Sequence, residues 1–301
     1  MEKPYILHMI TAAKNLSPFD VNMAIDAGWT NCLPYIGVEN DEVQALVQDA
    51  IFSRGPSGVK RTGIFFGGRD MHTAMDMMEI CRESMVPPFE VSAFADPSGA
   101  FTTAAGMVAK VEKALKDVHG TDLKDKCVVA LGGTGPVGMA AAVIAAKAGA
   151  DVQIMGRKKD KAQRVAGICN AEYGSDMTGI RGEANEHIDD ILDEVDVVFA
   201  TAAAGVQVMN EDQVKSATRL KVAADVNAVP PTGISGLDVM DDAAPITGSE
   251  SGAVGIGALA IGNAKYQTQH RLLKQMCEED KPVYLHFEHA FEVAREYVNG
   301  K

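Results

Sequence analysis

Three glycines, Gly133, Gly135 and Gly138, have the spacing G-x-G-x-x-G, and this stretch carries the most specific chemistry of the chain. A short apolar run, Cys127 to Leu131, precedes them, and an Ala-rich run and a second β-rich run, Val152 to Met155, follow. A strand, a glycine turn, a helix and a strand within about 30 residues form the context that a dinucleotide-binding motif requires. The alternative is a glycine turn that only connects a strand to a helix.

Each glycine of the motif has an expected task. Gly133 allows the tight turn, Gly135 lets the backbone approach a pyrophosphate, and Gly138 lets the helix lie close to the strand. The phosphates would bind at the helix N-terminus, where unpaired N–H groups and the helix dipole favour negative charge. The residues between the glycines complete the expected cofactor-binding turn: Thr134, Pro136 and Val137.

The end of the second strand predicts which dinucleotide binds. NAD-selective units usually place Asp or Glu there to bind the ribose 2′-hydroxyl, whereas this chain has Met155-Gly156-Arg157-Lys158. Arg157 and Lys158 would attract the 2′-phosphate of NADP, which a carboxylate would repel. NADP is therefore the first choice, and NAD is kept as the second. The alternative is that both cations belong to a solvated helix start.

Small and polar residues follow two later strands, which we expect over 196–201 and 220–226. Ala202 and Ala203 follow the first of these strands, and Asn227 follows the second. Small residues at such positions let a nicotinamide ring lie close to the backbone, so we assign all three residues to cofactor binding. Ordinary tight turns explain the same residues equally well.

Strands alternate with helices along the chain, which indicates parallel sheets covered by helices. Before the glycine motif, we expect strands over 5–10, 32–38, 62–66 and 89–95 and helices over 17–27, 40–52, 70–84 and 102–119. After it, we expect helices over 160–169, 183–194, 262–277 and 284–297. Asn40 and Asp70 are expected N-caps.

The fold class is therefore a two-domain α/β protein. We assign residues 1–118 to an N-terminal parallel-sheet substrate domain and residues 119–265 to a Rossmann NAD(P)-binding domain. Residues 266–301, which include a C-terminal helix, are expected to return and pack on the first domain. A substrate would then lie in the cleft between the domains.

The composition limits the classes of partner. The chain has 301 residues, with 41 acidic and 28 basic side chains, and its net charge of −13 argues against broad binding of nucleic acid or anionic membranes. Five scattered cysteines without a CxxC disfavour disulfides or zinc, and no metal is expected. The chain shows no apolar run of membrane-spanning length and no signal peptide, so we expect a cytoplasmic enzyme.

A resemblance to a known family runs through almost the whole chain. It is carried by SPFDVNMAIDAG near the start, FGGRDM at 66–71, DPSGAFTTAAG at 96–106, LGGTGPVGMAAA at 131–142, MGRKKDKAQ at 155–163, DVNAVPPTGISGLD at 225–238 and GALAIGNAKYQTQHR at 257–271. In this order, the segments resemble the methylene-tetrahydromethanopterin dehydrogenases of methylotrophic bacteria. Those enzymes are NAD(P)-dependent, and a sister group also accepts methylene-tetrahydrofolate.

The resemblance implies oxidation of the N5,N10-methylene group of a reduced pterin to a methenyl group, with hydride transfer to the nicotinamide. The product cation is stabilised by two flanking nitrogens, so hydride loss requires no coupled deprotonation. This fits a chain in which no catalytic His/Asp pair or metal cluster is recognisable. Catalysis would depend mainly on positioning.

The resemblance also suggests substrate-site residues. Lys265 lies in the GxxK segment and is assigned to catalysis through substrate positioning or local electrostatics; a solvated lysine at a helix start is the alternative. Asp20 is a candidate acceptor for the amino-pyrimidine edge of the pterin, or else a first-turn acid that favours the helix dipole. Thr102 and Thr103 would line the cleft, or else cap the long helix.

Other functions remain in competition. One is a dehydrogenase of methylene-tetrahydrofolate or of a shikimate-like acid; the latter needs a Lys/Asp pair that the sequence does not reveal. Another is a non-catalytic NADP-sensing protein, against which the elaborate first hundred residues count. The resemblance further implies a homo-oligomer, such as a trimer.

Overall fold

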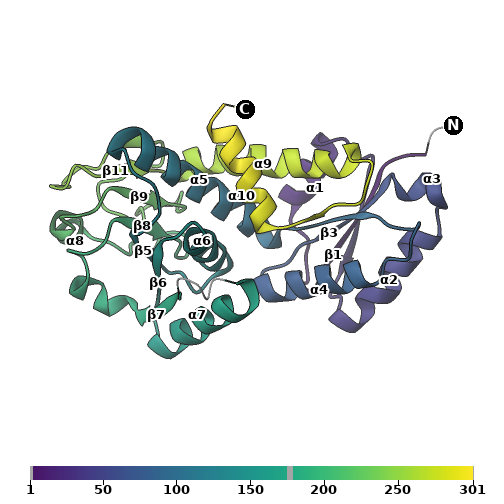
Figure 1. The fold of residues 1–301 in the computed structure, drawn as a ribbon, viewed down its shortest axis with the longest axis horizontal. Helices are drawn as coiled ribbons and strands as arrows, with labels where there is room; N and C mark the ends of the chain where they lie inside the picture. The colour runs from purple at the N-terminus through teal and green to yellow at the C-terminus, as the bar shows by residue number, and fades with distance from the viewer. Residues whose placement is uncertain (1–2, 175–178, 301) are drawn as a thin grey trace. The chain divides into compact units, whose positions relative to one another are not determined.

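The computed structural model describes residues 3–174 and 179–300, and the chain forms two compact units (Figure 1). The first unit comprises Met1–Thr102 and Tyr266–Val293, and the second comprises Thr103–Lys265 and Ala294–Lys301. The chain passes from one unit to the other inside α5 (Ala100–His119), α9 (Ala258–Glu278) and α10 (Phe287–Val298). Most of α5 clusters with the second unit, whereas we expected it within the first domain.

The first unit is built on a five-stranded parallel sheet with the order β12-β4-β3-β1-β2. Its strands are β1 (Ile6–Thr11), β2 (Asn31–Ile36), β3 (Thr62–Phe66), β4 (Ser92–Ala95) and β12 (Tyr284–Leu285). Its remaining helices are α1 (Pro18–Asp26), α2 (Asn40–Phe52), α3 (Pro56–Val59) and α4 (Met71–Glu83). The strand order reverses between β1 and β3, so their carboxyl ends flank a topological switch point.

The central strands of this sheet, β3 and β4, are buried along their whole length, as expected when helices cover both faces of a parallel sheet. The rings of Phe65 and Phe94 pack edge to face, with 5.5 Å between their centroids. β12 pairs with β4, and Phe287 packs edge to face on Phe101. Residues 266–293 thus return to the first unit, whereas Ala294–Lys301, which we also expected there, cluster with the second.

The second unit has a seven-stranded sheet with the order β10-β11-β9-β8-β5-β6-β7. Its strands are β5 (Cys127–Leu131), β6 (Asp151–Gly156), β7 (Arg181–Ala184), β8 (Val197–Ala200), β9 (Val222–Asp225), β10 (Asp242–Pro245) and β11 (Val254–Ile256). Among its described residues, the α-helices that belong to it alone are α6 (Pro136–Lys147), α7 (Lys159–Tyr173) and α8 (Glu211–Ser216). Apart from the antiparallel edge strand β10, this is the predicted Rossmann order, and its switch point lies between β5 and β8.

The helix predicted over 183–194 is wrong. The chain forms β7 and then a 3-10 turn, η2 (Asn185–Asp190). β7 pairs with β6 at the sheet edge, and Gly182 lies so close to α7 that a Cβ there would overlap the backbone of Ala162. The secondary structure of this segment is determined by its pairing with β6. Its sequence, RGEA, lacks the alternation of apolar and polar residues that would predict a strand. Strands β10 and β11, which are only four and three residues long, were not predicted either.

Helix caps follow from local chemistry and were mostly predictable. Asp70 is the N-cap of α4, as expected, and accepts a hydrogen bond from the N–H of Thr73 at 2.8 Å. α2 differs by one residue, because its N-cap is Glu39 and not Asn40. The side chain of Glu42 accepts from the N–H of Glu39 at 2.8 Å in a capping box.

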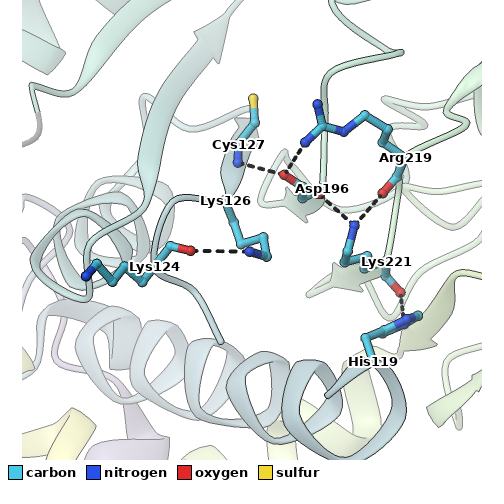
Figure 2. A network of polar contacts seen from close by, with 7 residues as sticks. All are labelled: His119, Lys124, Lys126, Cys127, Asp196, Arg219 and Lys221. Atoms are coloured by element: carbon cyan, nitrogen blue, oxygen red, sulfur yellow. Dashed lines mark hydrogen bonds and ion pairs between the residues drawn. The ribbon is translucent and has the colours of Figure 1, made fainter. Parts of the chain in front are cut away.

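A buried carboxylate, Asp196, joins the amino ends of β5, β8 and β9 (Figure 2). Its Oδ1 accepts from Nζ of Lys221 at 2.8 Å, and its Oδ2 accepts from the N–H of Cys127 at 3.1 Å and from Arg219 at 3.4 Å. His119, at the end of α5, contacts the carbonyl of Lys221 at 2.9 Å. Burial alone would raise the pKa of Asp196, but these hydrogen bonds and charges outweigh it and lower the pKa.

We expect Asp196→Asn to lower the free energy of unfolding by about 2 kcal/mol near neutral pH, because it removes charge-assisted hydrogen bonds. Folding lowers the pKa of Asp196. Its contribution to the free energy of unfolding is therefore fully present above the ordinary Asp pKa of about 3.9, and it is lost as the pH falls through the lowered pKa. Urea unfolding of both proteins from about pH 7 to about pH 3 should therefore show the difference shrink in acid.

The matched control is Asp151→Asn. Asp151 pairs with Arg181 at 2.9 Å, but both side chains are more than half exposed. We expect its loss to cost less than about 1 kcal/mol. Equal stabilities of the Asp196 variant and the control would contradict the role given to Asp196.

Candidate functional site

The turn after β5 is packed so tightly that it excludes side chains. Gly132 has a φ of +68°, and a Cβ there would lie 2.6 Å from the Cα of Ala202. The N–H of Gly133 donates to the carbonyls of Ala130 at 3.2 Å and Met155 at 2.9 Å. The left-handed residue of the turn is therefore Gly132, and Gly133 is needed because a Cβ there would meet the carbonyl of Ala130 at 2.6 Å.

The other two glycines of the motif differ in what surrounds them. A Cβ on Gly138 would overlap the Cα of Gly133, so this glycine lets α6 lie against the turn, as predicted. A Cβ on Gly135 would find only the carbonyl of Gly132, at 3.9 Å. The protein itself thus leaves room for a side chain at Gly135, and that space is available to a ligand.

The N-terminus of α6 faces this space with unpaired backbone donors. Gly135 is the N-cap, Pro136 is the first helical residue, and no side chain of residues 3–174 or 179–300 caps the helix. Thr134, Pro136 and Val137 are partly exposed. Free N–H groups and the positive end of the helix dipole suit an anion such as a pyrophosphate.

A basic pocket of about 460 Å³ lies beside the turn, lined by Thr134, Arg157, Lys158 and Lys161. A Cβ on Gly156 would come within 2.7 Å of the Thr134 methyl group, so the end of β6 packs directly on the turn. The structure therefore brings the predicted Arg157 and Lys158 together. It adds Lys161, from the first turn of α7, which the sequence analysis did not include.

Asn227 organises the loops that follow β8 and β9. Its Oδ1 accepts from the N–H groups of Val229 at 2.9 Å and Gly205 at 3.1 Å, and its Nδ2 donates to the carbonyl of Pro231 at 2.8 Å. The carboxylate of Asp225, whose pKa burial raises, accepts from the N–H of Asn227 at 2.9 Å. Asn227 thus serves the loops, and its contact with a cofactor stays a prediction.

Ala202 and Ala203 lie two and three residues after the end of β8, at the switch point of the second sheet. Ala202 packs against Gly132, and Ala203 is exposed. Larger side chains here would crowd the glycine turn. Their contact with a nicotinamide ring also stays a prediction.

The first unit has a pocket of about 250 Å³ at its own switch point. Its walls come from Ala13 and residues 15–17 after β1, from Pro18 and Asp20 on α1, from Gly68 and Arg69 after β3, and from Ser98 after β4. Ser98 has a φ of +54°, and its hydroxyl donates to the carbonyl of Gly68 at 2.6 Å, which joins the two loops. Open α/β sheets bind ligands at this position, so this is the candidate substrate pocket.

Asp20 is 2% exposed, and its Oδ1 accepts from Nε2 of Gln269 on α9 at 2.8 Å. The Oε1 atom of Gln269 is buried and has no hydrogen-bond partner among the residues that the structure describes. Arg69 is exposed on the pocket wall. The sequence predicted Asp20 but not Gln269 or Arg69; both lie in segments that carried the family resemblance.

Thr102, expected to line the substrate site, is fully buried. Its hydroxyl donates to Oδ2 of Asp96 at 2.7 Å, and its N–H donates to Oδ1 of Asp96 at 3.2 Å. The N–H of Phe101 donates to the same Oδ1 atom at 2.9 Å. Thr102 therefore belongs to the cap of α5, the alternative noted for it. Thr103 is partly exposed. Substrate contact by either threonine stays a prediction.

Lys265 is half-buried on α9. α5 approaches α9 closely here, since a Cβ on Gly106 would lie 3.0 Å from the backbone nitrogen of Lys265. Gln269 follows Lys265 by one helical turn. The catalytic assignment of Lys265 stays a prediction.

Two other kinds of site were not found within residues 3–174 and 179–300. No three His, Cys, Asp or Glu side chains come together in a way that could hold a metal ion. No helix there is both long and apolar enough to cross a membrane.

The two kinds of glycine in the turn predict different mutant behaviour. Gly138→Ala should lower the free energy of unfolding by about 2 kcal/mol, because the new methyl group overlaps backbone. Gly135→Ala should change stability by less than about 0.5 kcal/mol but weaken dinucleotide binding about tenfold, because its methyl group occupies the ligand's space. Urea unfolding and calorimetric titration measure the two effects, and an unaltered affinity of the Gly135 variant would contradict this assignment.

Comparisons with known proteins agree with this architecture. The family model "Methylene-tetrahydromethanopterin dehydrogenase, N-terminal" matches residues 18–98, which contain most of the first-unit pocket. The quinate dehydrogenase from Corynebacterium glutamicum in complex with NAD has a similar fold, with a TM-score of 0.55 at 13% identity over 96% of this chain and 98% of that one.

Two proteins of Methylorubrum extorquens are similar in sequence. "Bifunctional protein MdtA" is 33% identical over 89% of this chain and 90% of its own length. The "NAD(P)-dependent methylenetetrahydromethanopterin dehydrogenase" is 44% identical over 292 residues, which cover 97% of this chain and 98% of the relative. This confirms the resemblance seen in the sequence. The chain therefore belongs to the family of NAD(P)-dependent methylenetetrahydromethanopterin dehydrogenases.

Proposed function

We propose that this protein oxidises N5,N10-methylene-tetrahydromethanopterin to the methenyl form and transfers the hydride to NADP, within one-carbon (formaldehyde) oxidation. The observation that carries the proposal is the 44% identity, over 97% of the chain, to a relative that bears this activity in its name. Each unit has a candidate site at the switch point of its sheet, where such folds bind ligands.

The second unit has residues that fit a dinucleotide. The N-terminus of α6 offers unpaired N–H groups to the pyrophosphate, and the open space at Gly135 admits it. Arg157 and Lys158 favour NADP over NAD, because they present positive charge where NAD-selective units have a carboxylate. The bound dinucleotide supplies the hydride acceptor. NAD is the second dinucleotide to test, since the relative's name covers both.

The pocket of the first unit suits the edge of a pterin ring. This edge presents a ring N–H and an amino group as donors, beside a carbonyl acceptor. The carboxylate of Asp20 can accept from the two donors, and the guanidinium of Arg69 can donate to the carbonyl. Gln269 holds Asp20 in place through the 2.8 Å hydrogen bond.

The reaction does not require general acid–base catalysis by side chains of the protein. The methylene carbon loses a hydride with its electron pair, and the two neighbouring nitrogens delocalise the resulting positive charge. No proton has to leave in the same step. The protein's contribution is then to orient the pterin and to exclude water, and Lys265 is proposed to assist in positioning the pterin.

The proposal is tested by incubating the protein with NADP or NAD and with methylene-tetrahydromethanopterin, methylene-tetrahydrofolate or shikimate, while recording the absorbance of reduced nicotinamide. We expect the fastest turnover with methylene-tetrahydromethanopterin and NADP. Preference for the folate would favour the alternative dehydrogenase. Dinucleotide binding without turnover of any substrate would favour a sensing protein and would contradict the proposal.

Asp20→Asn should reduce kcat/KM for the pterin about a hundredfold, because an amide offers an N–H where the ring also offers donors. The affinity for NADP, measured by calorimetry, should stay within about twofold. Asp70→Asn is the matched control: Asp70 caps α4 from outside the pocket, and Asn is as good a cap. Equal kinetic losses in the two variants would argue against Asp20 as a pterin ligand.

We also propose a cytoplasmic homo-oligomer, with a trimer as the first state to test, that has no nucleic-acid partner. The family resemblance supports the assembly, and the net charge of −13 argues against a polyanionic partner. Light scattering coupled to size-exclusion chromatography measures the oligomeric state.

A further inference from the structure

The basic pocket beside the glycine turn contains one more cation than the strand-end motif accounts for. We propose that Lys161 binds the 2′-phosphate of NADP together with Arg157 and Lys158, and that it is a specificity-determining residue for NADP over NAD. This inference rests on the proposed function and identifies which side chains set its choice of dinucleotide.

The geometry places the pocket where the 2′ position of the adenosine ribose is expected. In Rossmann units the residue at the end of the second strand meets that position, and here β6 ends at Gly156, directly before Arg157. The opposite wall is Thr134 of the glycine turn, which packs on Gly156. Lys161, in the first turn of α7, closes a pocket that adjoins both the pyrophosphate turn and the strand end.

The charges around the pocket indicate an anionic ligand. Lys161, Arg157 and Lys158 are exposed, and none of them forms an ion pair with the residues that the structure describes. No carboxylate is among the described residues that line the pocket. Three uncompensated cations are concentrated at one position of a chain whose net charge is −13.

The position of Lys161 within α7 also indicates an anionic ligand. The first turn of a helix carries a partial positive charge and favours acids over lysines. Lys159 lies in the same turn, but Glu183 neutralises it at 2.7 Å. Lys161 has no such ion-pair partner in the described part of the chain, although Asp160 lies in the same first turn. A phosphate dianion in the pocket supplies that partner.

The 2′-phosphate carries nearly two negative charges, and three cations can share it. Lys161 should therefore contribute to NADP binding even when Arg157 is present. It should contribute little to NAD, which has a hydroxyl at the same position. Removal of Arg157 alone should then leave part of the preference for NADP in place.

The experiment is calorimetric titration of the full-length protein and its variants with NADP and with NAD. Lys161→Ala should raise the Kd for NADP about tenfold and change the Kd for NAD by less than about twofold. The control is Lys159→Ala. It removes a positive charge from the same helical turn, but from a lysine that already forms an ion pair with Glu183. The Kd values of this variant for NADP and NAD should both stay within about twofold of the wild-type values. Alanine is a good helix former, so both variants should fold.

A second probe isolates the phosphate from the rest of the dinucleotide. 2′-AMP should compete with NADP for the wild-type protein better than 5′-AMP does, and Lys161→Ala should remove most of that advantage. The inference is overturned if Lys161→Ala weakens NADP and NAD equally, or no more than Lys159→Ala does. A wild-type protein that binds neither dinucleotide would instead contradict the proposed function, so the two failures are distinguishable.

Discussion

The close approach of backbone to backbone at the glycine turn is the constraint on which the second unit depends. A Cβ atom at Gly132, Gly133 or Gly138 would collide with the loop after β8, with the end of β5 or with the turn itself. The missing side chains let β5, α6 and the loop after β8 meet at the switch point of the sheet. Only Gly135 has open space before it, and the N-terminus of α6 directs its free N–H groups there. The tight packing of three glycines thus leaves one place in the turn for an anion.

Buried carboxylates hold backbone segments of both units in comparable ways. Asp196 binds the amino ends of three strands, Asp225 binds the loop after β9, and Asp96 caps α5 through Thr102. In each case the carboxylate accepts backbone N–H groups that would otherwise be unsatisfied in the interior. Asp20 differs, because it is held by an amide from α9 and also lines a pocket. Among these four carboxylates, Asp20 is therefore the better candidate for recognising a ligand.

Charge is distributed unevenly over the chain. The protein is strongly acidic overall, yet one pocket beside the glycine turn is lined by three cations that form no ion pair with the described residues. An acidic surface weakens non-specific attraction to polyanions, while a confined basic pocket retains affinity for a single phosphate. The two properties together suit the proposed binding of a phosphorylated dinucleotide.

The sequence by itself determined the features that depend on near neighbours. The strand–turn–helix–strand order around Gly133, the cap at Asp70 and the Rossmann class are all local signals, and the structure confirms them. The residues that build the pockets were only partly predictable. Lys161 joins Arg157 because α7 begins at Lys159, directly after the strand-end motif, and Gln269 reaches Asp20 across 249 residues of sequence. The failed helix over 183–194 has the same origin, since pairing with β6 outweighed the local pattern. Periodicity and caps act over one or two turns, whereas the packing of distant segments decides which side chains share a pocket, and only the tertiary structure contains that information.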